Sequence, residues 1–357
     1  CTMQNIGLTN TRISAQSYVG GIAGCLYNST ISNCYNSGNV SSINENTFLK
    51  YHLGGIIGYL ANSTISNCYN TADISSSASY IGGIVGNNNN NVISTCYNAG
   101  TITFTANNPT QSDNGAGGIC GRIGNSSTIS NSYNKGNVQL TKSTNGCGNL
   151  GGIVGRQSNI DGNSFVEYCY NLGEIKVQSG CSADCASGIS GLEDPYCNIQ
   201  YCYNIGNVSG ANHNGEIRVP MSTEGLSKIE NCYCLDKGSG NANTSWVTKL
   251  STTQLQNDPY TDLSTPNFKK SPFYGTNNFN QKYLVLDLFH YGDTVQAAFT
   301  GNSFVYDSKP KKPTFTFPST STIGNTIMPI DPSMYTVTYE GIEGTSYDSS
   351  PLPPSAA

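Results

Sequence analysis

Short apolar segments bounded by glycine and asparagine recur along the first two thirds of the chain. One block reads G-G-I-x-G and occurs, with S-G-I-S-G as its last copy, at residues 20–24, 54–58, 82–86, 117–121, 151–155 and 187–191. A second block, I-S-x-C-Y-N-x-G in its fullest form, follows at residues 31–38, 65–72, 93–100, 129–136, 166–173 and 199–206, with a broken copy at 229–236. Brief β-branched runs between turn-forming residues predict short strands and not helices.

The tyrosine of the second block marks the repeat length. Its copies lie at residues 35, 69, 97, 133, 170, 203 and 233, so the step varies between 28 and 37 residues. A coil of about three short strands accommodates this variation, with insertions in the turns at 43–52, 105–115, 141–149 and 178–186. One coil cannot bury its own apolar face, but stacked coils can, because each strand pairs in parallel with its copy about 4.8 Å away. The sequence therefore predicts an all-β fold, a parallel β-helix or β-solenoid of about seven coils over residues 1–240.

Stacking places each residue type of the repeat above its own copies, in columns. The isoleucines of the first block are predicted to form an interior column: Ile22, Ile56, Ile84, Ile119, Ile153 and Ile189. The cysteines of the second block are predicted to form another column of buried, reduced thiols, which Ser132 interrupts: Cys34, Cys68, Cys96, Cys169, Cys202 and Cys232. The asparagines are predicted to form an amide ladder at a turn: Asn36, Asn70, Asn98, Asn134, Asn171 and Asn204.

The second block also requires a change of direction. Ile31 and Cys34 are three residues apart, so they cannot face the same side of a straight strand. We therefore expect a bend near Asn33, with Ile31 and Cys34 pointing inward and Tyr35 outward.

Two sets of residues are candidates for binding. The tyrosines could stack on glycans, although such a ladder can equally serve only to stabilise a sheet: Tyr35, Tyr69, Tyr97, Tyr133, Tyr170 and Tyr203. Arg122 and Arg156 directly follow two adjacent copies of G-G-I-x-G. They could form a cationic spot for an anionic sugar or carboxylate, or be an ordinary solvated pair.

Composition limits the partners, cofactors and cross-links that the chain can be expected to have. The net charge is −5 with only 11% charged residues and no basic block, which argues against nucleic-acid binding. No apolar run approaches the roughly 20 residues of a transmembrane helix. Of the 14 cysteines, eight lie outside the column, and Cys147, Cys181 and Cys185 are candidates for disulfides in an exported protein. No zinc spacing is present, and no cofactor is expected. Ca²⁺ at the Asn/Asp turns stays open, without EF-hand or RTX-type spacing.

The two repeated blocks resemble the GLUG-motif repeat of large bacterial surface and secreted proteins. After the repeat ends, residues 241–280 are expected to form a cap and connector. There, Ser251-Thr-Thr-Gln254 reads as the capping box of a short helix that covers the open end of the solenoid. Period-two segments such as YLVLDLF (283–289) and MYTVTYE (334–340) resemble bacterial Ig-like modules. Residues 281–357 are therefore predicted to form an Ig-like β-sandwich, which is incomplete.

The GLUG resemblance implies a surface location with an adhesive or architectural role, and it brings no catalytic residues. Acidic residues do not recur at one slot of adjacent coils, and Glu193-Asp194 is expected in a solvated turn. The predicted function is an extracellular structural or adhesive module (a stalk, adhesin or fibre subunit) without catalysis. Its expected partners are cell-surface glycans, proteins or copies of itself. The alternatives are a glycan-active β-helix enzyme (lyase or hydrolase) and a strand-exchange filament subunit. An ice-binding array would need regular threonines, and Thr30, Thr64 and Thr128 recur only in part.

Overall fold

The computed structural model describes most of the repeat region and short pieces of the C-terminal third of the chain. The described residues are 1–42, 51–77, 79–106, 114–143, 148–159, 162–219, 227–237, 247–257, 268–270, 284–286, 298–300, 314–316, 320–323 and 326–329.

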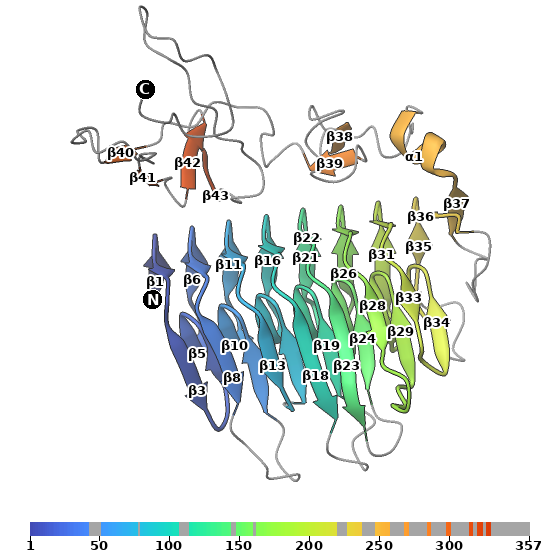
Figure 1. Ribbon diagram of the computed structural model, residues 1–357, viewed down its shortest axis with the longest axis horizontal. Helices are drawn as coiled ribbons and strands as arrows, with labels where there is room; N and C mark the ends of the chain where they lie inside the picture. The colour runs from blue at the N-terminus through green and yellow to red at the C-terminus, as the bar shows by residue number, and fades with distance from the viewer. Residues whose placement is uncertain are drawn as a thin grey trace, which may run out of the picture.

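Each coil contains five short strands, and the copies of each strand in successive coils form one sheet, so that five parallel sheets run along the molecule (Figure 1). Sheet A comprises β1 (Thr2–Gln4), β6 (Thr30–Ser32), β11 (Thr64–Ser66), β16 (Val92–Ser94), β21 (Thr128–Ser130), β26 (Ser164–Glu167), β31 (Cys197–Gln200) and β35 (Ile229–Glu230). Sheet B comprises β2 (Gly7–Leu8), β7 (Tyr35–Asn36), β12 (Tyr69–Asn70), β17 (Tyr97–Asn98), β22 (Tyr133–Asn134), β27 (Tyr170–Asn171), β32 (Tyr203–Asn204), β36 (Tyr233–Leu235) and β37 (Thr248–Leu250).

The other three sheets complete the coil. Sheet C comprises β3 (Arg12–Ala15), β8 (Asn39–Ser42), β13 (Ile74–Ser76), β18 (Ile102–Ala106), β23 (Val138–Ser143), β28 (Ile175–Val177) and β33 (Val208–Ser209). Sheet D comprises β4 (Val19–Gly20), β9 (His52–Gly54), β14 (Tyr80–Gly82), β19 (Gly115–Gly117), β24 (Asn149–Gly151), β29 (Cys185–Ser187) and β34 (His213–Gly215). Sheet E comprises β5 (Ala23–Tyr27), β10 (Ile57–Ala61), β15 (Val85–Asn89), β20 (Cys120–Ile123), β25 (Val154–Gln157) and β30 (Ser190–Glu193).

The pairing register places like residues over like residues. In sheet A, Ile31 pairs with Ile65, and Ile65 with Ile93. In sheet B, Tyr69 lies between Tyr35 and Tyr97. The predicted parallel β-solenoid is therefore confirmed, but the expectation of about three strands per coil is wrong. Strands of two residues, such as those of sheet B, are too short to show a period-two pattern in the sequence.

All four insertions fall at the same corner of the coil, between a strand of sheet C and the next strand of sheet D. They separate β8 from β9, β18 from β19, β23 from β24, and β28 from β29. The corners between sheets A and B, B and C, and D and E keep two or three residues in every coil, whereas the corner between sheets E and A varies from two residues to six, between β25 and β26.

A bend separates sheets A and B in every coil, as predicted. Asn33 has a φ of 54°, in the left-handed region, and its counterparts share this conformation: Asn67, Thr95, Asn131, Tyr168, Tyr201 and Asn231. Ile31 and Cys34 on either side of the bend are both fully buried. Asparagine tolerates this conformation better than most residues, which explains its frequency there.

The interior contains two apolar clusters on either side of the asparagine column. One contains the isoleucines of sheet A, the isoleucines of the G-G-I-x-G block and the cysteines, and the other lies between sheets C and D. The second glycine of each G-G-I block allows the backbone to approach the asparagine. A Cβ on Gly55 would lie 2.1 Å from the Gly83 carbonyl oxygen and 2.6 Å from Cγ of Asn70. These glycines are needed because the space is too small for any side chain.

After the last complete coil the chain extends sheet B and begins a short helix. Strand β37 pairs with β36, and α1 (Thr252–Asn257) comes directly after it. The capping box forms: the Gln254 amide donates to Ser251 Oγ (3.2 Å), and the Ser251 amide donates to Gln254 Oε1 (3.0 Å). Leu250 and Leu255 are buried against the tyrosine column at the end of sheet B. No helix in the described part of the chain is long and apolar enough to cross a membrane.

Three antiparallel strand pairs are described beyond α1. They are β38 (Phe268–Lys270) with β39 (Leu284–Leu286), β40 (Ala298–Thr300) with β41 (Thr314–Thr316), and β42 (Thr320–Ile323) with β43 (Thr326–Pro329). Most of residues 281–357 lie outside the described residues, so the Ig-like sandwich stays a prediction.

Candidate functional site

The predicted asparagine residues form a continuous hydrogen-bonded ladder through the interior. From Asn36 to Asn171, each side-chain amide donates to Oδ1 of the asparagine in the next coil at 2.8–3.0 Å. Each also donates to the backbone carbonyl two residues further on at 2.6–3.0 Å. The last amide, that of Asn204, donates to Oε2 of Glu216 at 3.0 Å. A carboxylate thus ends the series, and Lys237 Nζ lies 4.0 Å from it.

The cysteine column is also in register, and its members are free thiols. Each thiol donates to the backbone carbonyl two residues earlier, as Cys68 Sγ does to Ser66 at 3.2 Å. Ser132 takes the place of a cysteine in the same way: its hydroxyl donates to the Ser130 carbonyl at 2.8 Å and accepts from the Cys96 amide at 3.1 Å. Burial raises the pKa of the Cys68 and Cys202 thiols. These thiols are therefore protonated and poor nucleophiles.

The tyrosine column lies on the face of sheet B opposite the asparagines and forms a single stack. Successive rings from Tyr35 to Tyr203 have centroids 4.9–5.1 Å apart and planes within 8° of parallel. Neighbouring rings therefore cover both faces of each inner ring. Tyr97, Tyr133 and Tyr170 are fully buried although they lie on the face of sheet B away from the asparagines. The inner rings therefore have no free face on which a sugar could stack.

Arg122 and Arg156 are neighbours in sheet E, as the repeat predicted. Arg122 donates to Asn87 Oδ1 (3.3 Å) and Ser158 Oγ (3.4 Å) and lies over the Tyr80 ring, 5.7 Å from its centroid. Arg156 instead contacts both carboxylate oxygens of Asp194 at 3.3 Å. The two arginines therefore do not act as one cationic spot, because a carboxylate neutralises one of them.

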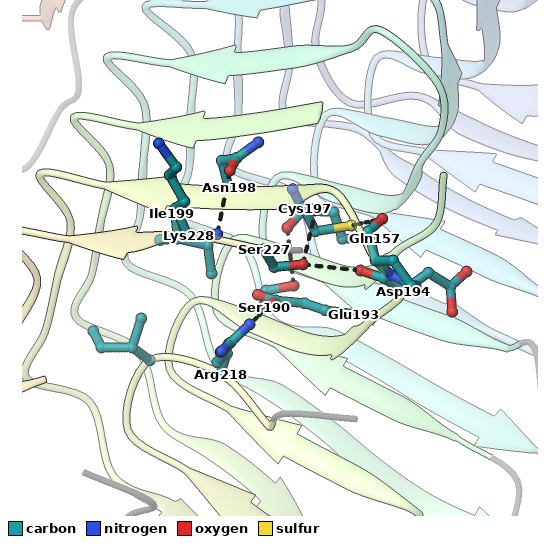
Figure 2. A network of polar contacts seen from close by, with 12 residues as sticks. Gln157, Ser190, Glu193, Asp194, Cys197, Asn198, Ile199, Arg218, Ser227 and Lys228 are labelled. Carbon is teal, nitrogen blue, oxygen red and sulfur yellow. Dashed lines mark hydrogen bonds and ion pairs between the residues drawn. The ribbon is translucent and has the colours of Figure 1, made fainter. Parts of the chain in front are cut away.

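Sequence reasoning missed a polar network at the C-terminal end of sheet E (Figure 2). Glu193 is 2% exposed and lies in register with Gln157, on the inward face of the sheet. Its Oε2 accepts from Arg218 Nη1 at 2.8 Å. Burial raises the pKa of Glu193 to about 7, and Arg218 opposes this shift. The expected solvated turn at Glu193-Asp194 is therefore wrong, because Glu193 is the last residue of β30 and Arg218, which pairs with Ser190 in the next coil, binds its carboxylate.

The same network ties the next segment of the chain to the coil (Figure 2). The Cys197 amide donates to Ser227 Oγ at 3.1 Å, and that hydroxyl donates to the Asp194 carbonyl at 3.3 Å. The Lys228 amide donates to Asn198 Oδ1 at 3.2 Å. These contacts continue sheet A into its final strand and close the edge of sheet E.

The candidate disulfides do not form among the residues that the structure describes. Cys181 is half-buried and Cys185 is buried, and both are free thiols. Cys147 lies outside the described residues. In the same described ranges, no group of three or more His, Cys, Asp or Glu residues is arranged to hold a metal ion.

A cluster of aromatic rings on the surface of the first coils is the second feature that sequence reasoning missed. The aromatic patch, as we call it here, comprises Tyr18, Tyr27, His52 and Tyr59 of two adjacent coils. Tyr18 directly precedes β4, buried His52 begins β9, and Tyr27 and Tyr59 lie in sheet E. Their ring centroids are 5.1–5.8 Å apart. Tyr18 is 45% exposed and Tyr27 60% exposed. The only sequence signal was that these tyrosines lie outside the repeated C-Y-N block.

Five in-register parallel sheets define this molecule as a parallel β-solenoid. Residues 15–41 and 51–75 match the family model of the GLUG motif. Each matched segment runs from sheet D to sheet C of the next turn, so one motif corresponds to one coil, and the GLUG resemblance is confirmed for these two coils. A similar solved structure is that of a "putative immunoglobulin A1 protease" from Bacteroides ovatus, with 18% identity, a TM-score of 0.46, and coverage of 77% of this chain and 91% of that one. No curated protein matches this chain.

Proposed function

We propose that this chain is an extracellular, non-catalytic structural module, a stiff rod that presents adhesive surfaces as part of a stalk, adhesin or fibre. The observation that carries the proposal is the parallel stacking of successive coils in all five sheets. Sheet B alone contains nine strands, which at about 4.8 Å per strand gives a stack roughly 40 Å long.

The interior supports a mechanical role. Hydrogen-bonded asparagines, stacked tyrosines and sheet pairing all link one coil to the next along the same axis. Each coil contacts chiefly its neighbours, so stability accumulates with the number of coils. Such a molecule resists bending without needing a large globular core.

The described carboxylates support the non-catalytic part of the proposal. Glycosidic bond cleavage uses two carboxyl groups that flank a substrate. Glu193 and Asp194 are adjacent, but Glu193 points into the solenoid to Arg218 and Asp194 contacts Arg156. The glycan-active enzyme is therefore less well supported than the structural module.

Two measurements test the proposal on the full chain. Small-angle scattering should give an elongated particle, and external protease should remove the chain from intact source cells while a cytoplasmic marker survives. A chain protected inside intact cells would overturn the proposal. So would cleavage of any polysaccharide from a representative panel, if the Glu193→Gln variant loses that cleavage. Particle length that grows with protein concentration would favour the filament alternative.

A further inference from the structure

The aromatic patch leaves ring surface available, which the tyrosine column does not. Tyr18 stacks on His52 with an interplanar angle of 30°, but it meets Tyr59 at 75°, and Tyr27 and Tyr59 are tilted by 52°, so the rings do not form a continuous stack.

A groove with polar walls borders this patch along the corner between sheets E and A. Its rim consists of the exposed residues of three successive coils: Asn28, Thr30, Asn62, Thr64, Asn90 and Val92. Its floor is formed by buried side chains, including Ser29 and Ser63. The volume is about 510 Å³, within the range of about 300–1,000 Å³ for small-molecule sites. Tyr27 immediately precedes Asn28, so the patch adjoins the rim of the groove at the first coil.

The rim repeats the same hydrogen-bonding groups from coil to coil. Asn28, Asn62 and Asn90 lie at the same turn, each with a left-handed φ of 48–61°. Asn90 Nδ2 donates to Asn62 Oδ1 at 2.6 Å, which aligns the amides along the rod. Amides and hydroxyls at intervals of about 4.8 Å offer donors and acceptors to a ligand that is itself a repeating chain.

The side chains of the three segments that build the groove carry almost no charge, although the Cys1 ammonium donates to the Asn28 carbonyl (3.4 Å) and Ser29 Oγ (3.3 Å) at one end. Residues 17–34, 51–69 and 79–98, which supply sheets D, E and A of these coils, contain no Asp, Glu, Lys or Arg, and His52 is the one ionisable base. An anionic ligand would find no counter-charge in these segments. Exposed aromatic rings with neighbouring uncharged amides and hydroxyls match a pyranose chain, which has apolar ring faces and hydroxyl edges.

We propose that the aromatic patch and the polar groove together bind an uncharged polysaccharide that lies along the rod across the first three coils. The aromatic patch stacks against sugar rings, and the asparagine and threonine rim bonds to their hydroxyl groups. This inference deepens the proposed function and rests on the chain being exposed to extracellular glycans.

The test is affinity electrophoresis of the full chain in gels that contain soluble mannan, xyloglucan or laminarin, with polygalacturonate and alginate as anionic arms. Tyr18→Asn and Tyr27→Ala should each weaken binding to at least one neutral polysaccharide by about two- to twelve-fold, the range for one aromatic contact. Asn62→Asp, which places an anion on the rim, should weaken the same binding. Circular dichroism must show that each variant stays folded.

Tyr196→Asn is the matched control. Tyr196 is 44% exposed with a φ of 64°, against 45% and 50° for Tyr18, but it lies outside the aromatic patch. Asparagine tolerates this backbone conformation at both positions. Binding should therefore be unchanged in Tyr196→Asn.

Three results would overturn the inference. They are no retardation by any neutral polysaccharide, equal loss in Tyr18→Asn and Tyr196→Asn, or binding only to the anionic arms that Arg122→Gln removes. None of these results affects the scattering and protease measurements, so failure of the glycan site can be separated from failure of the structural role.

Discussion

Replacing one asparagine of the interior ladder should destabilise the solenoid strongly. Asn98 is fully buried and makes three side-chain hydrogen bonds: it donates to the Gly100 carbonyl (2.8 Å) and Asn134 Oδ1 (2.9 Å), and it accepts from Asn70 Nδ2 (2.9 Å). The Asn98→Ala variant removes all three bonds and leaves the partner groups in the interior.

The magnitude depends on the number of groups that lose a partner. Each buried donor or acceptor left unsatisfied costs about 1–3 kcal/mol. Three such groups give roughly 3–9 kcal/mol, and relaxation of the adjacent turn favours the lower half of that range. Asn39→Ala is the control, because Asn39 is an exposed strand residue in sheet C. A surface change of this kind should stay within about 0.5 kcal/mol.

Guanidinium unfolding followed by far-ultraviolet circular dichroism measures both variants. Asn98→Ala should lower the midpoint well below that of Asn39→Ala with a similar slope, since the surface exposed on unfolding is unchanged. If the free energy of unfolding of Asn98→Ala falls by less than about 1 kcal/mol relative to the control, the amide ladder does not hold the coils together and the reasoning is wrong.

Three further predictions concern buried side chains. Glu193 has its pKa raised from 4.5 to about 7, so it stabilises the fold below pH 4.5 and this contribution, roughly 3 kcal/mol, is lost as the pH rises to 7. Thermal melts of Glu193→Gln should lack that decline, and an identical pH profile would contradict the assignment. Ser132→Cys should melt within a few degrees of the parent. Ser132→Ala leaves the buried Cys96 amide without an acceptor and should lower the free energy of unfolding by about 1–3 kcal/mol. Equal melting temperatures for both variants would refute the role of the hydroxyl. Ellman's reagent should react readily with exposed Cys1 but with Cys68 only after unfolding; rapid labelling of the column thiols in the folded chain would show that the interior is open.

The features that depend on repetition could be predicted from the sequence. A residue that recurs in every coil must lie over its copies, so the isoleucine core and the parallel pairing could be inferred directly from the spacing. The bend at Asn33 could be inferred from the three-residue interval between two apolar positions, because a straight strand cannot place both on one face.

The features that depend on single, unrepeated residues could not be predicted. Arg218 meets Glu193 because the chain after β34 stays in register with the coil before it, which pairs Arg218 with Ser190, and no arginine occupies the equivalent position of the earlier coils. Tyr18 and Tyr59 belong to neighbouring coils, and their ring centroids lie 5.8 Å apart. The sequence does not indicate this contact, because it depends on how the chain turns within each coil. The burial of the tyrosine stack could not be predicted, because the repeat spacing indicates which way the rings point but not which residues cover them.

The amide ladder gives the molecule a direction in which repeats can be gained or lost. From Asn36 onward, one N–H of each side-chain amide donates to the following coil, and the series finishes on the carboxylate of Glu216. Duplication or deletion of a whole coil upstream of Asn204 would leave each donor with an acceptor. A repeat added after Glu216 would bury a carboxylate that cannot donate a hydrogen bond to the next coil. Lineages that lengthen or shorten such rods should therefore do so through internal coils and retain the same terminal turn.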